Sequence, residues 1–289
     1  CFYVTGLAAG FGYNRGLKIP AQNEVQNFPL IAGLANPTLI GGTTPSPAQA
    51  LSSLETWVPP ERGEYWLAAG LQFTTFEIIN TNALLIVEFG RDFVIAVVGI
   101  ATLKQPLIGD PYVYAELDIE VVVEPAQGDV RASAVLAPSS YVLTPQAHLT
   151  GGFAFFAWFG TNAHAGDFVF TLGGYHPAFK VPSHYPQESR VGINWKVNDS
   201  IALVGGVYFA ITPTAMMAGG GLQLTFAAGS LHAWFKAQID IILFWKPFYL
   251  IADASSTVGG SYRVDALFVH TTLSVELSAD FHLWAPPIG

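Results

Sequence analysis

Apolar and polar residues alternate along residues 113–121, and this alternation predicts a β-strand with one buried and one solvent-facing side. Glu116, Asp118 and Glu120 occupy every second position there, between Ala, Leu, Ile and Val. The next residues, 125–129, include Pro, Gly and Asp, which favour a turn, and a second apolar segment follows them. The pattern predicts an antiparallel hairpin whose three carboxylates lie on a solvated face.

Three further turns separate strand-like segments in the same way. They are centred on residues 80–82, 198–200 and 227–230, and each contains Asn, Asp or Gly, which readily adopt the backbone conformations of tight turns. Many of the flanking strands are apolar on both faces, as in residues 93–98 and 153–159. The sequence therefore predicts a succession of β-hairpins with much apolar surface to bury.

Only residues 47–58 have helical spacing, with Ser46 as N-cap, Pro47 at the first helical position and Pro59 and Pro60 as a stop. One short helix cannot cover about a dozen strands, so the apolar faces must meet each other, another part of a longer chain, or lipid. We therefore predict an all-β fold in which long antiparallel strands and hairpins form a large sandwich or a barrel-like sheet.

A short internal similarity bears on the domain organisation. Residues 12–20 and 174–182 both begin with Gly-Tyr and end with Lys, an aliphatic residue and Pro, and each follows a Gly-rich apolar strand. This similarity predicts two tandem repeat-like units, 1–160 and 161–289, the first with an irregular insertion at about 21–64; one continuous domain is the alternative. A repeat array favours an extended scaffold over a compact enzyme.

Composition narrows the class of protein. Of 289 residues, 51% are hydrophobic and only 11% are charged, which argues against intrinsic disorder, and the net charge of -9 argues against nucleic-acid partners. The single cysteine, Cys1, excludes an internal disulfide. The longest uncharged apolar run, residues 93–103, is about half of the roughly 20 residues that a membrane-spanning helix needs, so no helical membrane span is predicted.

The two ends of the chain carry a further expectation. The chain begins without Met, directly in an apolar strand-like run, and stops without a polar tail. We therefore expect it to be part of a longer protein. Nothing in the sequence indicates a compartment.

The densest polar stretch suggests where chemistry is located. Imidazoles and a carboxylate that titrate near neutral pH can do acid–base work or bind a metal, but the histidine spacing fits no compact zinc pattern and no thiolate is available. The alternative is structural: two turns ending in proline, 175–177 and 184–186, fix a long connection between strands. We predict a polar binding cluster, without catalytic residues, metal or cofactor, made of His164, Asp167, Tyr175, His176, Lys180, His184, Tyr185 and Arg190.

Other candidate positions each have a plain structural alternative. Asp240 and Glu88 lie inside apolar strands. Each is interpreted either as a functional buried carboxylate or as a residue at a sheet edge or facing a lumen. The glycines at 219–221 permit close packing or a bulge. Four tryptophans end or interrupt strands. They are interpreted as a membrane-interface belt, as a platform for sugar stacking or as part of the core: Trp195, Trp234, Trp245 and Trp284.

Several of these residues also carry a family resemblance. The segments Gly173-Gly-Tyr-His-Pro-Ala-Phe179 and His184-Tyr-Pro186, with Tyr208–Pro213 and Met217–Gly221 downstream, resemble an uncharacterised family of large β-rich proteins from bacteria and fungi, a domain of unknown function. The resemblance covers most of the chain. It implies a β-rich fold and longer relatives, but it supplies no activity and no catalytic residues.

Three functions remain open from the sequence. The first is a non-enzymatic β scaffold or binding module, whose apolar face binds a hydrophobic small molecule or lipid, packs on the rest of a longer parent chain, or self-associates. The second is a membrane β-barrel or pore-forming component, although too many strands are apolar on both faces for a polar lumen. The third is a hydrolase-like enzyme centred on residues 164–190, where no nucleophile is paired with a base.

Overall fold

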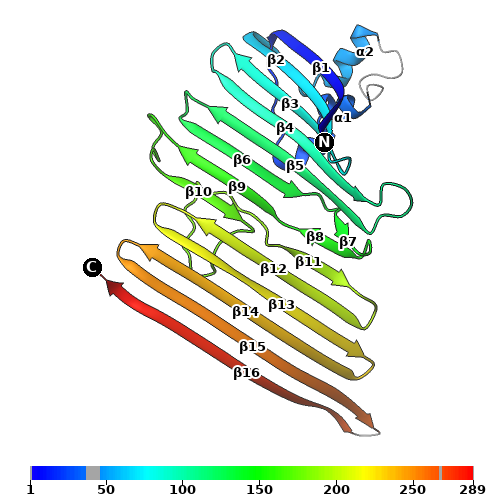
Figure 1. The fold of residues 1–289 in the computed structure, drawn as a ribbon, viewed down its shortest axis with the longest axis vertical. Helices are drawn as coiled ribbons and strands as arrows, with labels where there is room; N and C mark the ends of the chain where they lie inside the picture. Colours follow the sequence, from blue (N-terminus) through cyan, green and yellow to red (C-terminus); the bar gives the residue numbers. More distant parts are fainter. Residues whose placement is uncertain (1, 37–45, 267–268, 289) are drawn as a thin grey trace. The chain divides into compact units, whose positions relative to one another are not determined.

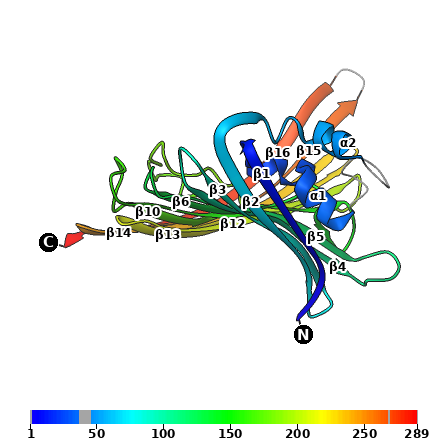
Figure 2. The same cartoon turned by 90° about the horizontal axis from the view of Figure 1, so that it is seen from above.

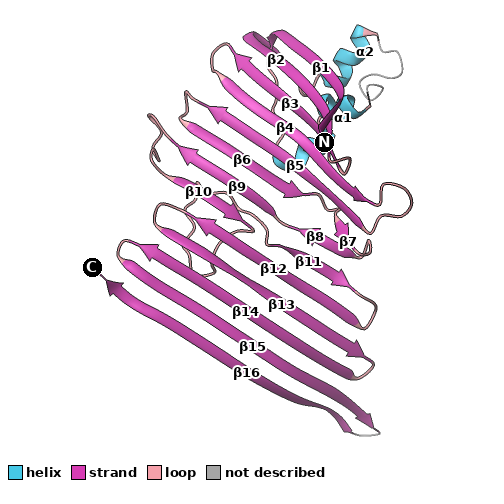
Figure 3. Cartoon of the chain, in the orientation of Figure 1, coloured by secondary structure: helices cyan, strands magenta, loops and turns pink. Residues whose placement is uncertain are grey.

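The computed structural model describes residues 2–36, 46–266 and 269–288, and strands dominate it. Figures 1 and 3 show long strands, labelled β1 to β16, joined mostly by tight turns, with helices confined to the N-terminal part. The pairings between neighbouring strands are antiparallel. This confirms the predicted all-β fold of long antiparallel hairpins.

The chain folds as two compact units. Unit 1 contains Cys1–Ser139 and Ala154–Phe168, and unit 2 contains Ser140–Phe153 and Val169–Gly289. The boundary predicted near residue 160 therefore falls in a stretch that alternates between the two units.

Unit 1 is an antiparallel meander in which each strand pairs with the next along the chain. Its strands are β1 (Phe2–Arg15), β2 (Pro60–Thr75), β3 (Ile79–Phe89), β4 (Val94–Gln105), β5 (Val113–Glu124) and β6 (Asp129–Leu136), and β9 (Gly152–Trp158) is shared between the units. The hairpin turn predicted at residues 80–82 is wrong, because these residues lie inside β3. The chain turns earlier, where Phe76 and Glu77 have φ of 54° and 60°, so no glycine marks the turn.

The described residues of the predicted irregular insertion form three short helices: η1 (Gln22–Asn27, a 3-10 helix), α1 (Pro29–Ala35) and α2 (Pro47–Leu54). The predicted cap of α2 is present, since the Ser46 hydroxyl accepts a hydrogen bond from the Gln49 amide at 3.3 Å. The helix ends at Leu54 rather than at residue 58. Residues 37–45 of the insertion lie outside the described residues.

The insertion covers one face of the strands of unit 1. Phe28 and Ile31 are 0% and 1% exposed and pack in a cluster with Trp66, Ile86 and Val98 from the sheet. Figure 2 shows α1 and α2 on one side of β1–β5. The segment predicted to be irregular therefore provides apolar residues that bury this face of the sheet. The single predicted helix could not have covered it alone.

The opposite face of unit 1 is apolar and open, and we call it the open apolar face. Cross-strand pairs such as Phe11 with Leu67 and Leu67 with Val87 place the odd-numbered residues from Leu7 to Tyr13 of β1 on the same side as the odd-numbered residues of β2 and β3. Its largest side chains remain exposed: Leu7 78%, Phe11 75%, Leu67 55%, Leu85 44% and Phe89 41%. In other proteins, exposed apolar surface of this extent is typical of sites of interaction.

Unit 2 is a second antiparallel meander. Its strands are β7 (Tyr141–Val142), β8 (Ala147–Thr150), β10 (Phe168–Leu172), β11 (Val191–Lys196), β12 (Ile201–Ile211), β13 (Ala215–Ala228), β14 (Leu231–Trp245), β15 (Phe248–Ala266) and β16 (Val269–Ile288). Strands β12 to β16 pair in sequence order, and β11 pairs with β12 and β8. The structure confirms the turns predicted near residues 198–200 and 227–230, which separate β11 from β12 and β13 from β14.

The long strands of unit 2 have one polar and one apolar face. On β14, Lys236, Gln238 and Asp240 alternate with apolar residues, and their partners on β15 are Thr257, Ser255 and Asp253. We call this side the polar face of unit 2. The opposite side carries exposed apolar residues such as Val275 at 77%.

Neither unit closes into a barrel within the described residues, because β1 pairs only with β2 and β16 only with β15. The proposed repeat remains a prediction. Its two nine-residue copies differ locally, since Gly12 lies in β1 whereas Gly174 lies in a loop with φ of 87°.

Candidate functional site

The loop between β10 and β11, residues 173–190, brings together part of the predicted polar cluster. Tyr175, His176 and Tyr185 are 8%, 4% and 7% exposed, and Arg190 at the end of the loop contacts the same region. All four belong to unit 2. The loop is therefore a packed element and not a solvated connection.

Arg190 ties the loop together. Its Nη1 donates to the Gly173 carbonyl at 2.9 Å, and its Nη2 donates to the Tyr175 carbonyl at 2.7 Å. The guanidinium also lies over the ring of Tyr208 on β12, 3.7 Å from the ring centroid. One side chain thus joins two points of the loop to the sheet.

Tyr208 continues the network across the sheet. Its hydroxyl donates to Asp240 Oδ1 at 2.6 Å, and Gln238 Nε2 donates to Asp240 Oδ2 at 2.5 Å. Burial raises the pKa of Tyr208 far above its ordinary value, and the bond to Asp240 adds to this rise. A side chain at Gly219 would place its Cβ 2.6 Å from the Tyr208 hydroxyl, so only glycine fits between the two partners.

His176 is buried in this network as a neutral imidazole. Burial lowers its pKa, and the nearby carboxylates of Asp240 and Asp253 only partly oppose this effect. Its Nδ1 accepts from the Ala178 amide at 3.0 Å, which places the proton on Nε2. In the described part of the chain, Nε2 has no hydrogen-bond partner.

Aromatic stacking packs the remainder of the loop. Tyr175 stacks on Phe179 and on Tyr185, with centroids 5.8 and 6.3 Å apart, and its hydroxyl donates to the Pro186 carbonyl at 2.9 Å. His184 packs against Tyr185 edge to face at 4.9 Å. Burial raises the pKa of Glu188 in the same loop to about 7.

Three of the predicted residues do not join this cluster. His164 and Asp167 belong to unit 1, in a turn where the Asp167 amide donates to the His164 carbonyl at 2.9 Å. Lys180 lies in the loop but is exposed. The eight residues predicted as one cluster are therefore divided between two units.

The sequence did not join Tyr208, Gln238, Asp240 and Met217 to the cluster; Met217 belongs to it because its sulfur accepts from the His176 amide at 3.3 Å. They come from three different strands, and only the register of β12, β13 and β14 brings them together. The sequence contained a weak signal for a polar site here. Asp240 is a charged residue inside an apolar strand, and the three consecutive glycines 219–221 lie in the preceding strand. At Gly219 the structure shows close packing without a bulge in the register.

The network is suited to holding the loop in place more than to acid–base chemistry. Both oxygens of Asp240 accept hydrogen bonds, and Arg190 is engaged with two carbonyls. Within the described ranges, no group of three or more His, Cys, Asp or Glu side chains is placed to hold a metal ion. These contacts hold the loop against the sheet.

The carboxylates of β5 lie on the opposite side from the one predicted. The register of β4 and β5 pairs Asp118 with Ile100 and Val122 with Ala96, on the face that the insertion covers. Asp118 is 3% exposed and accepts from Gln26 Nε2 of η1 at 3.0 Å. Burial raises the pKa of Asp118 to about 6. The predicted solvated face of this strand is therefore wrong.

This burial makes the stability of unit 1 depend on pH through Asp118. A raised pKa means that ionisation of Asp118 costs more in the folded chain than in the unfolded chain, whose carboxyl titrates near 3.8. The cost is absent below pH 4 and complete above about pH 6. We expect Asp118→Asn to stabilise unit 1 by about 1–3 kcal/mol at pH 8 and by much less at pH 4.

Urea unfolding at the two pH values measures this difference. Asp110→Asn, in an exposed turn, is the matched control and should change little. An Asp118→Asn effect that is the same at pH 4 and pH 8 would show that the carboxyl is not desolvated.

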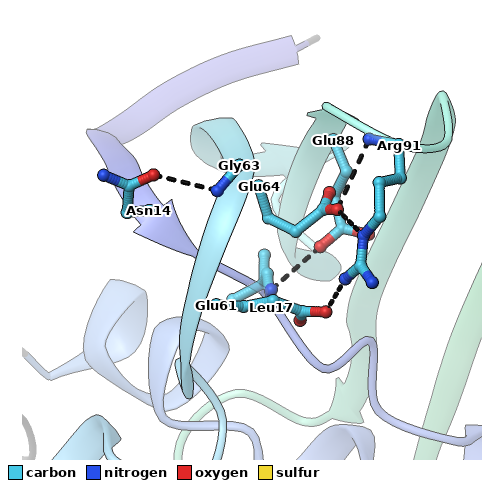
Figure 4. A network of polar contacts seen from close by, with 7 residues as sticks. All are labelled: Asn14, Leu17, Glu61, Gly63, Glu64, Glu88 and Arg91. Atoms are coloured by element: carbon cyan, nitrogen blue, oxygen red, sulfur yellow. Dashed lines mark hydrogen bonds and ion pairs between the residues drawn. The ribbon is translucent and has the colours of Figure 1, made fainter.

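Glu88 also has a structural role. Its Oε1 accepts from the Leu17 amide at 3.0 Å, which fixes the chain as it leaves β1 (Figure 4). Burial raises the pKa of Glu88, and the Leu17 hydrogen bond partly opposes this. Beside it, Arg91 forms ion pairs with Glu61 and Glu64. These contacts hold the ends of neighbouring strands together.

Comparison with known proteins identifies the family. The model of DUF6603, a family of unknown function, matches residues 1–289, so the chain belongs to this family. No curated protein and no solved structure matches the chain significantly. Among the described helices, none is both long enough and apolar enough to cross a membrane.

Proposed function

We propose that this member of a family of unknown function is a non-enzymatic binding module whose open apolar face takes up the acyl chain of a lipid. The observation that carries the proposal is a hollow on that face. It has a volume of about 420 Å³, within the range of about 300–1,000 Å³ typical of small-molecule sites.

The shape of the hollow follows from the sizes of neighbouring side chains. Ala9 and Ala69 are cross-strand partners at its base, and Ala69 pairs on its other side with Leu85. Phe11 and Leu67 form the adjacent, larger pair. Small side chains flanked by large ones leave a shallow apolar channel across β1–β3.

The chemistry of the hollow favours an apolar chain. Its lining consists of Ala, Gly, Phe, Leu and Val among the described residues, without a charged or hydrogen-bonding side chain. Each methylene group buried there contributes about 0.8 kcal/mol. A flexible acyl chain can follow such a channel without needing a polar partner.

Filling the hollow should abolish lipid uptake. Ala69 is exposed, so Ala69→Trp adds an indole to the channel without disturbing the covered core. We expect the full chain, purified without detergent, to carry extractable lipid in native mass spectrometry, and Ala69→Trp to reduce the bound fraction at least tenfold. Ala163→Trp, at an exposed turn position of the same unit, is the matched control and should retain lipid.

Other occupants of this face give different results. A lipid-free symmetric dimer that Ala69→Trp dissociates would show that a second copy covers the face, and would contradict the proposal. A lipid-free monomer that binds no added fatty acid would contradict it as well. Lipid that remains bound in both variants would place the binding site elsewhere.

A further inference from the structure

A groove on the polar face of unit 2 is a separate candidate for binding. It extends across β11–β15 and has a volume of about 530 Å³. Its lining includes Arg190 and Asp240 of the buried network together with residues from the neighbouring strands. The groove lies on a different unit from the lipid hollow and differs from it in chemistry.

A missing side chain at Gly221 opens the groove. Gly206 and Gly221 are cross-strand partners in its lining, and the Arg190 side chain packs against Gly206, where an added Cβ would lie 2.9 Å from Arg190 Cβ. A Cβ on Gly221 would meet no atom closer than 3.5 Å, the Ala237 carbonyl oxygen, and this is an ordinary contact distance. Packing therefore does not require glycine at this position, and strands disfavour it. Its effect is to leave the groove unfilled, with the backbone accessible to a ligand.

The walls of the groove are rich in uncharged hydrogen-bonding groups. Amides come from Asn194, Gln223 and Gln238, and hydroxyls come from Ser255 and Thr257. Each amide both donates and accepts, and so does each hydroxyl. Such walls match a ligand whose own groups are mainly hydroxyls, since a hydroxyl also needs a donor and an acceptor.

Few charged side chains line the groove. Arg190 is offset by Asp240, and both are engaged in the buried network, so Lys236 is the remaining charged side chain among the described residues of the lining. The buried contacts of Arg190 and Tyr208 hold this end of the groove in a fixed geometry. A fixed polar site in which most hydrogen-bonding groups are uncharged favours an uncharged polar ligand over an ion.

The indole ring of Trp234 lies on the polar face of unit 2, two residues from Lys236 along β14. Trp234 is half-buried, and its ring packs over Gly259 of β15, where an added Cβ would approach it to 2.5 Å. Its Nε1 donates to Glu276 Oε2 at 3.0 Å, which fixes the ring orientation. A fixed indole beside hydroxyl-binding groups provides an apolar surface for a sugar ring.

We propose that this groove binds uncharged oligosaccharides. The amides and hydroxyls of its walls hydrogen-bond to the sugar hydroxyls, the gap at Gly221 admits a sugar ring close to the backbone, and Trp234 extends the site along β14.

The experiment is titration calorimetry of the full chain with three neutral probes: maltotriose, cellotriose and tri-N-acetylchitotriose. We expect at least one to bind with a dissociation constant below 1 mM, a bound of about 4 kcal/mol. Gly221→Val should weaken it at least tenfold. Gly260→Val is the matched control, because its nearest atom is also a carbonyl oxygen at 3.5 Å and it lies on the opposite face of the sheet.

A second variant keeps the test independent of folding. Gln223 is exposed, so Gln223→Ala removes one amide from the wall without affecting the core, and it should weaken binding about three- to tenfold. The proposal is overturned if no neutral probe binds, or if Gly221→Val and Gly260→Val behave alike. Binding only of an acidic probe, trigalacturonate, together with its loss in Lys236→Gln, would likewise overturn it in favour of an anion site.

Discussion

Replacing Phe28 by alanine is expected to destabilise unit 1 by about 3–5 kcal/mol. Phe28 is 0% exposed, caps the start of α1, and packs against Trp57 with ring centroids 5.1 Å apart. Truncation leaves a cavity between the insertion and the sheet, because strands on one side and helices on the other cannot collapse together. The covered face of the sheet then loses the packing contacts of the Phe28 ring.

Hydrogen exchange of β2–β4 measures this loss locally, without the assumption that both units unfold together. Phe76→Ala is the matched control, since Phe76 is 70% exposed in the β2–β3 turn and should cost less than about 0.5 kcal/mol. Equal effects of the two variants would show that the insertion does not cover the sheet.

Replacing Arg190 by methionine is expected to cost about 2–5 kcal/mol in unit 2 and to release the 173–190 loop. The Gly173 and Tyr175 carbonyls lose their donors, and the Tyr208 ring loses the cation above it. Arg190→Lys should restore little, because an ammonium group cannot bond to two carbonyls in a planar fork and stack on a ring.

Limited proteolysis within residues 173–190 is the direct measurement. The wild-type loop should resist cleavage, and the Arg190→Met loop should be cut rapidly. Lys180→Met serves as the control, because Lys180 lies in the same loop but is exposed. If Lys180→Met is cut as rapidly as Arg190→Met, the Arg190 contacts do not hold the loop.

The sequence revealed strands and turns better than it revealed which face of a strand is buried. The alternation of polar and apolar residues along β5 shows that its two faces differ in polarity. Which face is buried depends on the segments that pack against each of them. Asp118 is buried because η1 lies over it and Gln26 provides a hydrogen bond. η1 and α1, of six and seven residues, are too short to show helical periodicity.

The candidate site was predictable only where its residues are close in sequence. Tyr175, His176, Tyr185 and Arg190 lie within one polar segment, and the structure packs them together. Tyr208 and Asp240 are 32 positions apart and meet only through strand register, which a single sequence does not specify. His164 and Asp167 show the converse, since closeness in sequence placed them with residues of another unit.

The meander of β12 to β16 also has a consequence for how unit 2 folds. Each of these strands pairs with its immediate predecessor, so contacts form between segments close in sequence and ring-closure entropy stays small. During synthesis, each new strand of this meander can pair with a strand that has already been made. We therefore expect unit 2 to assemble in strand order, from β12 towards β16.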